Sequence, residues 1–491
     1  MKRNVLFTIV LMIILQFTMT IENCFSQWQP EVRLTNDSAL SMTFNSAWCI
    51  ASSGDNVHVV WYDGRDSVGF STEIYYKRST DGGINWGTDI RLTNAIYNSS
   101  NPSIAVSGQF VHVVWYDTRS GQGQVFYKRS TNGGLNWGPD VVLGSDLGSN
   151  YPSIAVSGSS VHVVWNKWQG TSNTEVYYKC SNDGGATWGT DIRLTNNPYE
   201  SFYPSVAVSG QTVNVAWWDL RDANREIYYK RSSDGGTNWG ADTRLTNDPG
   251  NSVNVRIAAY GQLVNVVWDE QRDGNEEIYY KRSTDGGLNW GADTRLTNNN
   301  DISREPSVTI SGTFVHIVWQ DDRDNGNSHL YYKRSTDGGV NWGADVRLTN
   351  TPARSYNPSI SLSGSVVHIV CYDLRGNLGN SEIYYMRNPT GNSVGIKNIS
   401  TEIPSAFSLS QNYPNPFNNS SKFKFEIAKL GNVKIVVFDL MGREVATLVN
   451  ESLAPGTYET TFDGSALSSG TYLYKLTSGS FIQTKKLTLI K

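Results

Sequence analysis

The sequence predicts an all-β protein, in which a seven-bladed β-propeller closed by an N-terminal strand is followed by a small immunoglobulin-like β-sandwich. Two sequence markers recur about every 51 residues, which is the pattern of a repeat architecture. The composition, with 45 glycines, 26 tyrosines and only 18% charged residues, is typical of a β protein rich in turns. The length of 491 residues exceeds what one hydrophobic core normally supports, so at least two units are expected.

Residues 1–26 are expected to form a signal peptide. Lys2 and Arg3 precede an apolar run from Val5 to Thr18, which is too short for a membrane span of about 20 residues. Cleavage is predicted after Ser26. The mature chain is therefore expected to have no transmembrane segment.

The repeat occupies residues 27–392. One marker is the segment Ser79–Trp86, and the other is Val57–Trp61, which occurs in seven copies. Each copy predicts four short strands, because apolar residues on both strand faces and Gly-rich turns favour strands packed between neighbouring sheets. Four-stranded units of this length are typical of a β-propeller. The third residue of the first marker is Asp81, Asn132, Asp183, Asp234, Asp285 or Asp337.

The two ends of the repeat predict a closed ring. Trp28–Asn36 matches Trp342–Asn350, which is a fourth strand, whereas the seventh copy stops after its third strand near Arg387. We therefore expect the N-terminal segment to supply the missing outer strand of the seventh blade. Such a closure removes the free edges of an open array of sheets.

The pattern Ser-x-Asp-x-Gly-x-x-Trp resembles the Asp-box, the repeat named after bacterial neuraminidases. An Asp side chain accepts hydrogen bonds from the backbone of its own turn, Gly supplies a positive φ, and Trp packs into the blade. In the families that carry it, the box is a fold element on the face away from the active site. The resemblance therefore implies a structural role for the box aspartates. Five histidines that share one strand position, including His58, are expected to be buried hydrogen-bonding groups.

The loop after the second strand of each unit carries an acidic residue and an arginine two positions apart. Two interpretations stay open: structural ion pairs that hold the loops, or a charged rim that binds sugars or a protein partner. The candidate pairs are Asp63/Arg65, Asp117/Arg119, Asp219/Arg221, Glu270/Arg272, Asp321/Arg323 and Asp373/Arg375. An acidic loop with Asp321, Asp322 and Asp324 is expected to be solvated rather than to hold calcium.

Departures from the repeat give further candidates. The third unit replaces the acidic residue and arginine by Lys167 and Gln169, with Trp168 between them as a candidate stacking surface for a ligand. The entry to the first strand also varies between units, and these positions should surround the mouth of the central channel. They include Tyr151, Tyr203, Arg256, Arg304 and Glu305.

Sialidases carry the same box but use six blades, an Arg-Ile-Pro motif, a Tyr activated by Glu and an Asp acid/base. No Arg-Ile-Pro occurs here, and Arg304-Glu-Pro306 is the nearest segment. The weak catalytic candidates that this resemblance implies are Glu305, Tyr203, Arg304 and Arg256. A sialidase-like glycoside hydrolase is thus an alternative to a binding protein, and a non-catalytic adhesion or structural scaffold is another.

The C-terminal segment predicts a separate domain. Residues 393–405 are expected to be a linker, because they are rich in Asn, Ser, Gly and Pro. Residues 406–491 resemble the type A C-terminal sorting domain of the type IX secretion system, on segments such as Phe407–Phe417 and Val433–Val445. The alternation in Val433–Val437 fits an immunoglobulin-like sandwich. The resemblance implies that this domain contacts the type IX machinery and sends the protein to the cell surface or medium.

Taken together, the sequence predicts a secreted or surface-bound binding protein. Glycan or protein recognition by the propeller ranks first. The net charge of −4 gives no reason to expect nucleic acid as a partner. No cofactor and no metal site are expected.

Overall fold

The computed structural model describes residues 28–44, 48–66, 71–144, 148–170, 173–324, 326–375, 380–389, 396–400, 403–418, 420–429, 431–453, 455–463 and 467–490. The predicted signal peptide lies outside these residues. In the part of the chain that the structure describes, no helix is long and apolar enough to cross a membrane. One compact unit spans Pro30–Arg387, and a second contains Asn388–Lys491.

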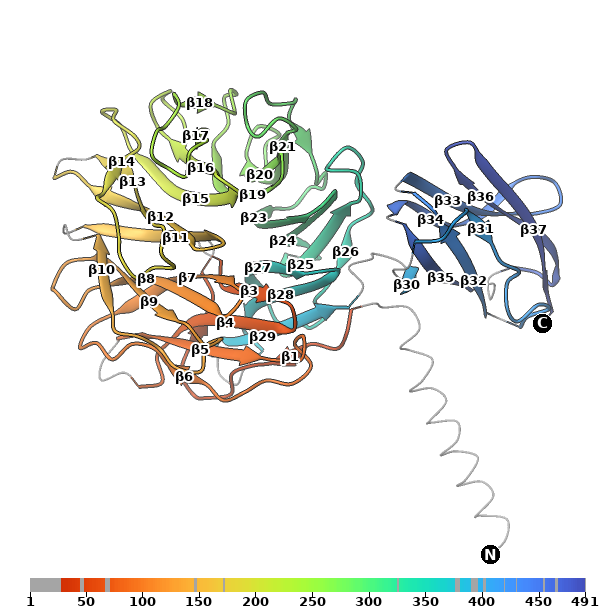
Figure 1. Cartoon of the computed structure of the whole chain (residues 1–491), viewed down its shortest axis with the longest axis horizontal. Coiled ribbons are helices and arrows are strands. Elements are labelled where there is room, and N and C mark those ends of the chain that lie inside the picture. The colour runs from red at the N-terminus through yellow and green to blue at the C-terminus, as the bar shows by residue number, and fades with distance from the viewer. Residues whose placement is uncertain are drawn as a thin grey trace, which may run out of the picture. The chain divides into compact units, whose positions relative to one another are not determined.

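The described part of the first unit contains seven antiparallel sheets, numbered here in chain order of their first full strand (Figure 1). Sheet 1 comprises β2 (Ser41–Met42), β3 (Ile50–Ser53), β4 (Asn56–Asp63), β5 (Glu73–Ser79) and β6 (Ile90–Arg91). Sheet 2 comprises β7 (Ser99–Ser107), β8 (Phe110–Asp117), β9 (Gln124–Ser130) and β10 (Val141–Gly144). Sheet 3 comprises β11 (Ser149–Ser157), β12 (Ser160–Trp168), β13 (Thr174–Ser181) and β14 (Ile192–Arg193). Sheet 4 comprises β15 (Ser201–Ser209), β16 (Thr212–Asp219), β17 (Glu226–Ser232) and β18 (Thr243–Arg244).

The remaining three sheets repeat this order of strands. Sheet 5 comprises β19 (Ser252–Tyr260), β20 (Leu263–Glu270), β21 (Glu277–Ser283) and β22 (Thr294–Arg295). Sheet 6 comprises β23 (Ser303–Ser311), β24 (Phe314–Asp324), β25 (Asn327–Ser335) and β26 (Val346–Arg347). Sheet 7 comprises β27 (Ser355–Ser363), β28 (Val366–Asp373), β29 (Glu382–Asn388) and, as its outer strand, β1 (Val32–Arg33).

The N-terminal strand completes the last sheet, as the sequence predicts. Val32 pairs with Tyr385 and Arg33 with Tyr384, so the two ends of the unit share one sheet. The first long strands of all seven sheets line one cavity of about 230 Å³, which places them around a common axis. Figure 1 shows the resulting ring of sheets.

Both faces of each sheet are buried, because each sheet packs between two neighbours. One core cluster, for example, joins Val60, Ile74 and Tyr76 of sheet 1 to Ile104 and Trp115 of sheet 2. This explains why the strands carry apolar residues in near-continuous runs rather than in strict alternation.

In sheets 1 and 3–6 the turn after the third strand is held by its own aspartate side chain, and sheet 2 has Asn132 at this position. Asp81 Oδ1 accepts hydrogen bonds from the backbone N–H of Asn85 (2.8 Å) and from Ser79 Oγ (2.7 Å). Gly83 lies against the Tyr385 ring of the preceding sheet, and Trp86 meets the same ring edge-on at 4.8 Å. These turns therefore also join neighbouring sheets.

The repeated histidines are buried hydrogen-bonding groups, as predicted. His58 Nδ1 lies 2.6 Å from the Tyr76 hydroxyl in the same sheet. In sheet 4 the equivalent asparagine, Asn214, accepts a hydrogen bond from Tyr229 at 2.6 Å. Burial lowers the pKa of His58 to about 4, so the ring stays neutral at neutral pH.

The acidic turns give a testable pH dependence. Hydrogen bonds, first from the backbone N–H of Asn238, lower the pKa of Asp234 to about 2, compared with about 3.9 in an unfolded chain. Because the folded pKa is the lower one, this stabilisation is complete above pH of about 4 and disappears as the pH falls through about 2. The urea concentration at the unfolding midpoint should fall as the pH is lowered over this range. We expect this fall to be shallower in Asp234→Asn and steeper in Asn132→Asp. Equal profiles for both variants and the parent would contradict this account.

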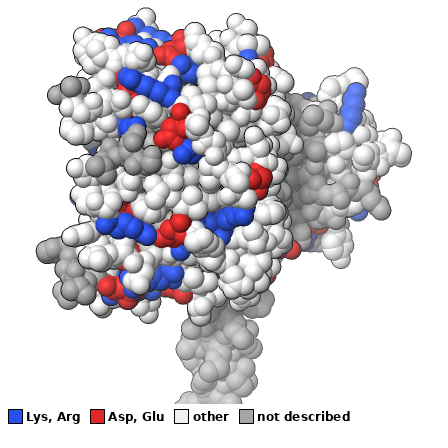
Figure 2. Space-filling view, turned by 60° about the vertical axis from the view of Figure 1, so that its left-hand side comes forward, with Lys and Arg blue, Asp and Glu red and all other residues white. Residues whose placement is uncertain are grey.

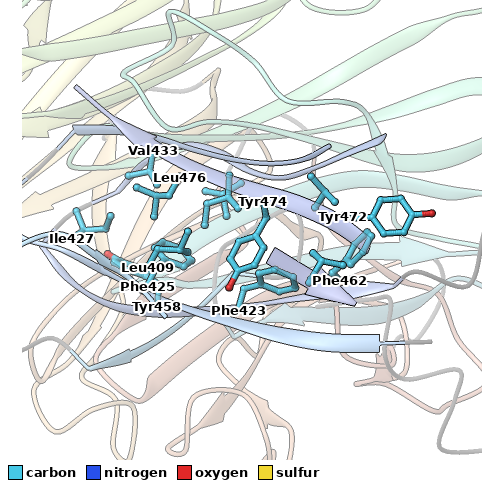
Figure 3. Close-up of a cluster of buried hydrophobic side chains, with 14 of the residues drawn as sticks. Leu409, Phe423, Phe425, Ile427, Val433, Tyr458, Phe462, Tyr472, Tyr474 and Leu476 are labelled. Atoms are coloured by element: carbon cyan, nitrogen blue, oxygen red, sulfur yellow. The ribbon is translucent and has the colours of Figure 1, made fainter. Parts of the chain in front are cut away.

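The described part of the C-terminal unit contains two four-stranded antiparallel sheets. One sheet has the order β30 (Ile396–Ser400), β35 (Gly456–Asp463), β32 (Ser420–Ile427), β31 (Ser408–Leu409). The other has the order β34 (Glu444–Leu453), β33 (Gly431–Phe438), β36 (Gly470–Ser478), β37 (Phe481–Leu489). Figure 3 shows the apolar core of this unit, in which Phe423 packs edge-on against Tyr474 at 4.6 Å.

The predicted linker, residues 393–405, requires a correction. Its residues Ile396–Ser400 form β30, which pairs with β35 of the C-terminal unit. The polar composition of this segment concealed the strand, because an edge strand needs few apolar side chains when its backbone hydrogen bonds are made on one side only.

Candidate functional site

One end of the ring is lined by residues in a strained backbone conformation. In six sheets the first long strand carries a bulge, and a non-glycine residue there has a φ between 48° and 56°. Such left-handed residues cost about 1–3 kcal/mol and cluster at functional sites. They are Asn101, Tyr151, Tyr203, Asn254, Glu305 and Asn357. We call this end, where the second strands also finish, the mouth.

Aromatic side chains gather on one sector of the mouth. The Tyr151 ring lies 4.4 Å from the Tyr203 ring, 5.2 Å from Phe202 and 5.7 Å from Phe44, between ring centroids. Phe202 in turn lies 5.4 Å from Trp218. We call these five residues the aromatic cluster. All but Trp218 are partly exposed, so the cluster presents apolar ring surface to solvent.

The position of Tyr203 is fixed by the neighbouring sheet. Asn166 Oδ1 accepts a hydrogen bond from the Tyr203 backbone N–H at 2.9 Å, and Asn166 Nδ2 donates to the Ser201 carbonyl at 2.8 Å. Asn166 follows the core tryptophan of its strand, where other sheets have Tyr62 or Tyr116. Sequence reasoning missed Asn166, although this break in the repeat was the available signal.

Charged groups lie beside the aromatic cluster. Arg256 is only 3% exposed and donates to the Val255 carbonyl at 2.8 Å. Burial lowers its pKa to about 10, so it remains charged at neutral pH, and it interacts electrostatically with Asp269, Glu305 and Tyr203. Three of the four weak catalytic candidates, Tyr203, Arg256 and Glu305, are thus neighbours. The fourth, Arg304, pairs with Asp322 at 3.5 Å.

Asp269 is a member of this group that the sequence analysis missed. It is buried, its Oδ2 accepts a hydrogen bond from Asn254 Nδ2 at 2.8 Å, and its Oδ1 has no hydrogen-bond partner among the described residues. Burial raises the pKa of its carboxyl group well above the ordinary value. We call Tyr203, Arg256, Asp269 and Glu305 the polar cluster.

The acidic residues of the predicted rim hold the fold. Asp219 Oδ2 accepts from Ser201 Oγ and Trp217 Nε1, both at 2.9 Å. Both of its oxygens also accept from the Arg221 guanidinium, at 2.8 and 2.6 Å. Arg221 stacks over the Tyr228 ring at 4.2 Å. The carboxylate therefore has no acceptor position left for a ligand.

The same network continues to the preceding sheet, sheet 3. Arg221 Nη1 donates to Asp242 at 2.9 Å, Lys230 pairs with the other oxygen of Asp242, and Lys230 also donates to the Leu194 carbonyl of sheet 3 at 2.6 Å. The same arrangement recurs at the other predicted pairs, namely Asp63/Arg65, Asp117/Arg119 and Asp321/Arg323. It recurs with minor variation at Glu270/Arg272 and Asp373/Arg375. Figure 2 shows acidic and basic side chains side by side on one side of this unit. Of the two interpretations of the rim, the geometry supports structural ion pairs.

Sheet 3 departs from this network. Lys167 Nζ lies 4.7 Å over the Tyr177 ring, where the other sheets stack an arginine, and Gln169 Oε1 accepts from the Tyr177 hydroxyl at 3.4 Å. Lys167 thus takes over a packing role. Trp168 is 54% exposed and ends the same strand that carries Asn166. Of the predicted binding residues, Trp168 has the most accessible aromatic surface.

The comparison with protein families identifies the C-terminal unit. Residues 411–491 match the model of the secretion system C-terminal sorting domain. This unit is a type IX sorting domain. It directs the chain to type IX secretion, so the protein is located at the cell surface or is secreted.

Solved structures resemble the chain in fold. The polysaccharide lyase Uly1 has a TM-score of 0.52 at 10% identity, over 73% of this chain and 98% of that chain. An endosialidase of phage phi92 has a TM-score of 0.46 at 10% identity, over 86% of this chain and 75% of that chain. A Trypanosoma rangeli sialidase mutant displaying trans-sialidase activity has a TM-score of 0.41 at 10% identity, over 82% of this chain and 86% of that chain. At this identity the likeness to the lyase shows a shared fold alone. No curated protein sequence matches the chain.

Proposed function

We propose that the exported chain is a glycan-binding protein. In this proposal, residues 27–392 form a seven-bladed Asp-box β-propeller, residues 1–26 are a cleaved signal peptide, and the sorting domain is an immunoglobulin-like sandwich. The mouth is the binding surface. The observation that carries the proposal is the aromatic cluster, because Tyr151, Phe202 and Tyr203 bring three partly exposed rings within 5.2 Å of one another at the mouth.

The chemistry of the mouth suits a saccharide. Tyr151, Phe202 and Tyr203 offer partly exposed rings on which the apolar face of a sugar can stack. Glu305 and Asn254, on the two adjoining sheets, supply acceptors and donors for hydroxyl groups. Trp168 adds a second exposed ring at the end of β12.

The test is binding of the mature chain, residues 27–491, to a glycan array. We expect binding that Tyr151→Ala and Trp168→Ala each weaken about fivefold to thirtyfold, because a lost stacking contact costs about 1–2 kcal/mol. Tyr97→Ala is the matched control, since Tyr97 is 55% exposed but lies outside the aromatic cluster. Equal losses for Tyr97→Ala, or no glycan bound at all, would favour a protein-binding scaffold.

A second candidate function, glycoside hydrolysis of the sialidase-like kind, is favoured by the polar cluster. Cleavage of a glycosidic bond uses a proton donor and a second carboxyl group. Burial raises the pKa of Asp269 well above the ordinary value, which suits a proton donor, and Asp269 lies within electrostatic range of Glu305. Hydrolysis of a fluorogenic glycoside that Glu305→Gln and Asp269→Asn both abolish, with folding intact, would establish this function in place of binding alone.

A further inference from the structure

An arginine at the end of the third strand normally holds the box turn of the next sheet. Arg78 Nη1 donates to the Gly133 carbonyl at 2.7 Å, and Arg129 Nη1 donates to the Gly184 carbonyl at 2.6 Å. Arg282 and Arg387 make the same bond to Gly338 and Gly82. The guanidinium group is thereby used in contacts between sheets.

Arg231 occupies this position in sheet 4 but does not make the bond. Gly286 is the residue of sheet 5 that corresponds to Gly133, Gly184 and Gly338. The Nε atom of Arg231 is buried and has no hydrogen-bond partner in the described part of the chain. Among the described residues Arg231 also forms no ion pair within 4.0 Å, so its charge is not neutralised by a direct contact.

Arg231 instead lines a cavity of about 430 Å³ between the box turns of sheets 4 and 5. This volume is in the range of small-molecule sites. Arg231 is the one charged residue that lines it. Trp239 and Leu288, the latter 65% exposed, supply apolar surface, and the hydroxyl and amide groups come from Ser233, Asn238 and Thr243.

We propose that this cavity binds a carboxylated sugar residue, a uronate. The carboxylate pairs with the Arg231 guanidinium through charge-assisted hydrogen bonds. The sugar hydroxyls bond to Ser233 and Thr243, and the apolar face of the ring lies against Trp239 and Leu288. Since the box turns lie at the opposite end of the third strands from the mouth, this site is independent of the mouth and of the function proposed for it.

The experiment uses NMR to follow the indole N–H signal of Trp239 in the mature chain. The signal is assigned by its loss in Trp239→Phe. The mature chain is then titrated with D-galacturonate and, separately, with D-galactose. We expect a saturable shift with galacturonate and a much weaker response to galactose. Arg231→Gln should weaken galacturonate binding at least about tenfold, since it removes the charged partner. Higher ionic strength should also weaken binding.

The matched control is Arg282→Gln in sheet 5, where the arginine is engaged with Gly338 at 3.1 Å. This variant should lower stability and leave the affinity for galacturonate unchanged. Tyr203→Ala at the mouth should also leave it unchanged. The proposal is overturned if galactose binds as well as galacturonate, if Arg231→Gln keeps full affinity, or if the Trp239 signal shows no saturable shift.

Discussion

Gly83→Ala is expected to lower the free energy of unfolding by about 2–5 kcal/mol. Gly83 has a φ of +88°, and a Cβ atom there would lie 1.8 Å from the hydroxyl oxygen of Tyr385. The substitution therefore adds about 1–2 kcal/mol of backbone strain to about 1–3 kcal/mol of overpacking. Because Tyr385 is on β29, which pairs with the N-terminal strand, the damage falls where the ring closes.

Gly54→Ala in the same sheet separates the two causes. Gly54 has a φ of +57°, and nothing lies within 4 Å of the position of its Cβ atom. It should therefore show only the backbone strain, about 1–2 kcal/mol. Urea unfolding of both variants measures the difference. Equal losses would mean that the contact between Gly83 and Tyr385 adds nothing to stability.

Asp219→Ala is expected to cost about 3–5 kcal/mol, because it leaves the partly buried charge of Arg221 without its nearest partner. It also removes the acceptor of the buried Trp217 indole N–H. Asp301→Ala is the control, since Asp301 is an exposed residue and its loss should change stability by no more than about 0.5 kcal/mol.

The double variant Asp219→Ala/Arg221→Leu tests the cause of this loss. When both charges are removed, no unpaired charge stays in the structure, so the double variant should be more stable than Asp219→Ala alone. Sheet 3 already lacks both residues and is folded, with Lys167 over the Tyr177 ring. A double variant that loses as much as the sum of both single variants would show that the pair stabilises through independent contacts.

The strand order and the closure by Trp28–Asn36 could be predicted because a repeat averages out local ambiguity. All seven copies of the pattern predict the same order of strands. The fourth strand at Trp28–Asn36 has no first three strands of its own, and only the seventh sheet lacked a fourth strand. The linker prediction failed at Ile396–Ser400, where a single unrepeated segment gave no such average. The sorting domain was recognised over residues 406–491, and the family model matches residues 411–491.

The candidate site was predictable only in part. Tyr203, Arg256 and Glu305 stood out as breaks in the repeat near one end of the first strand, and they do lie together. Asp269 and Asn166 were missed because they lie on the second strand, one residue before the positions of the acidic residues that attracted attention. Their proximity to Tyr203 depends on the bulge and on the neighbouring sheet, and neither can be read from one strand.

The sequence by itself determined the number of repeats, the strands of each repeat, the N-terminal closure and the export signal at the C-terminus, because each depends on local pattern or direct resemblance. Only the tertiary structure decided which polar groups have hydrogen-bond or ion-pair partners within the protein. Asp219 and Arg231 both occupy positions that recur around the ring, yet Asp219 is saturated by its own sheet, whereas Arg231 does not make the bond that Arg78 and Arg282 make. The physical reason is that a hydrogen bond between sheets depends on angles and distances that differ slightly at each interface, while the repeated sequence stays nearly the same.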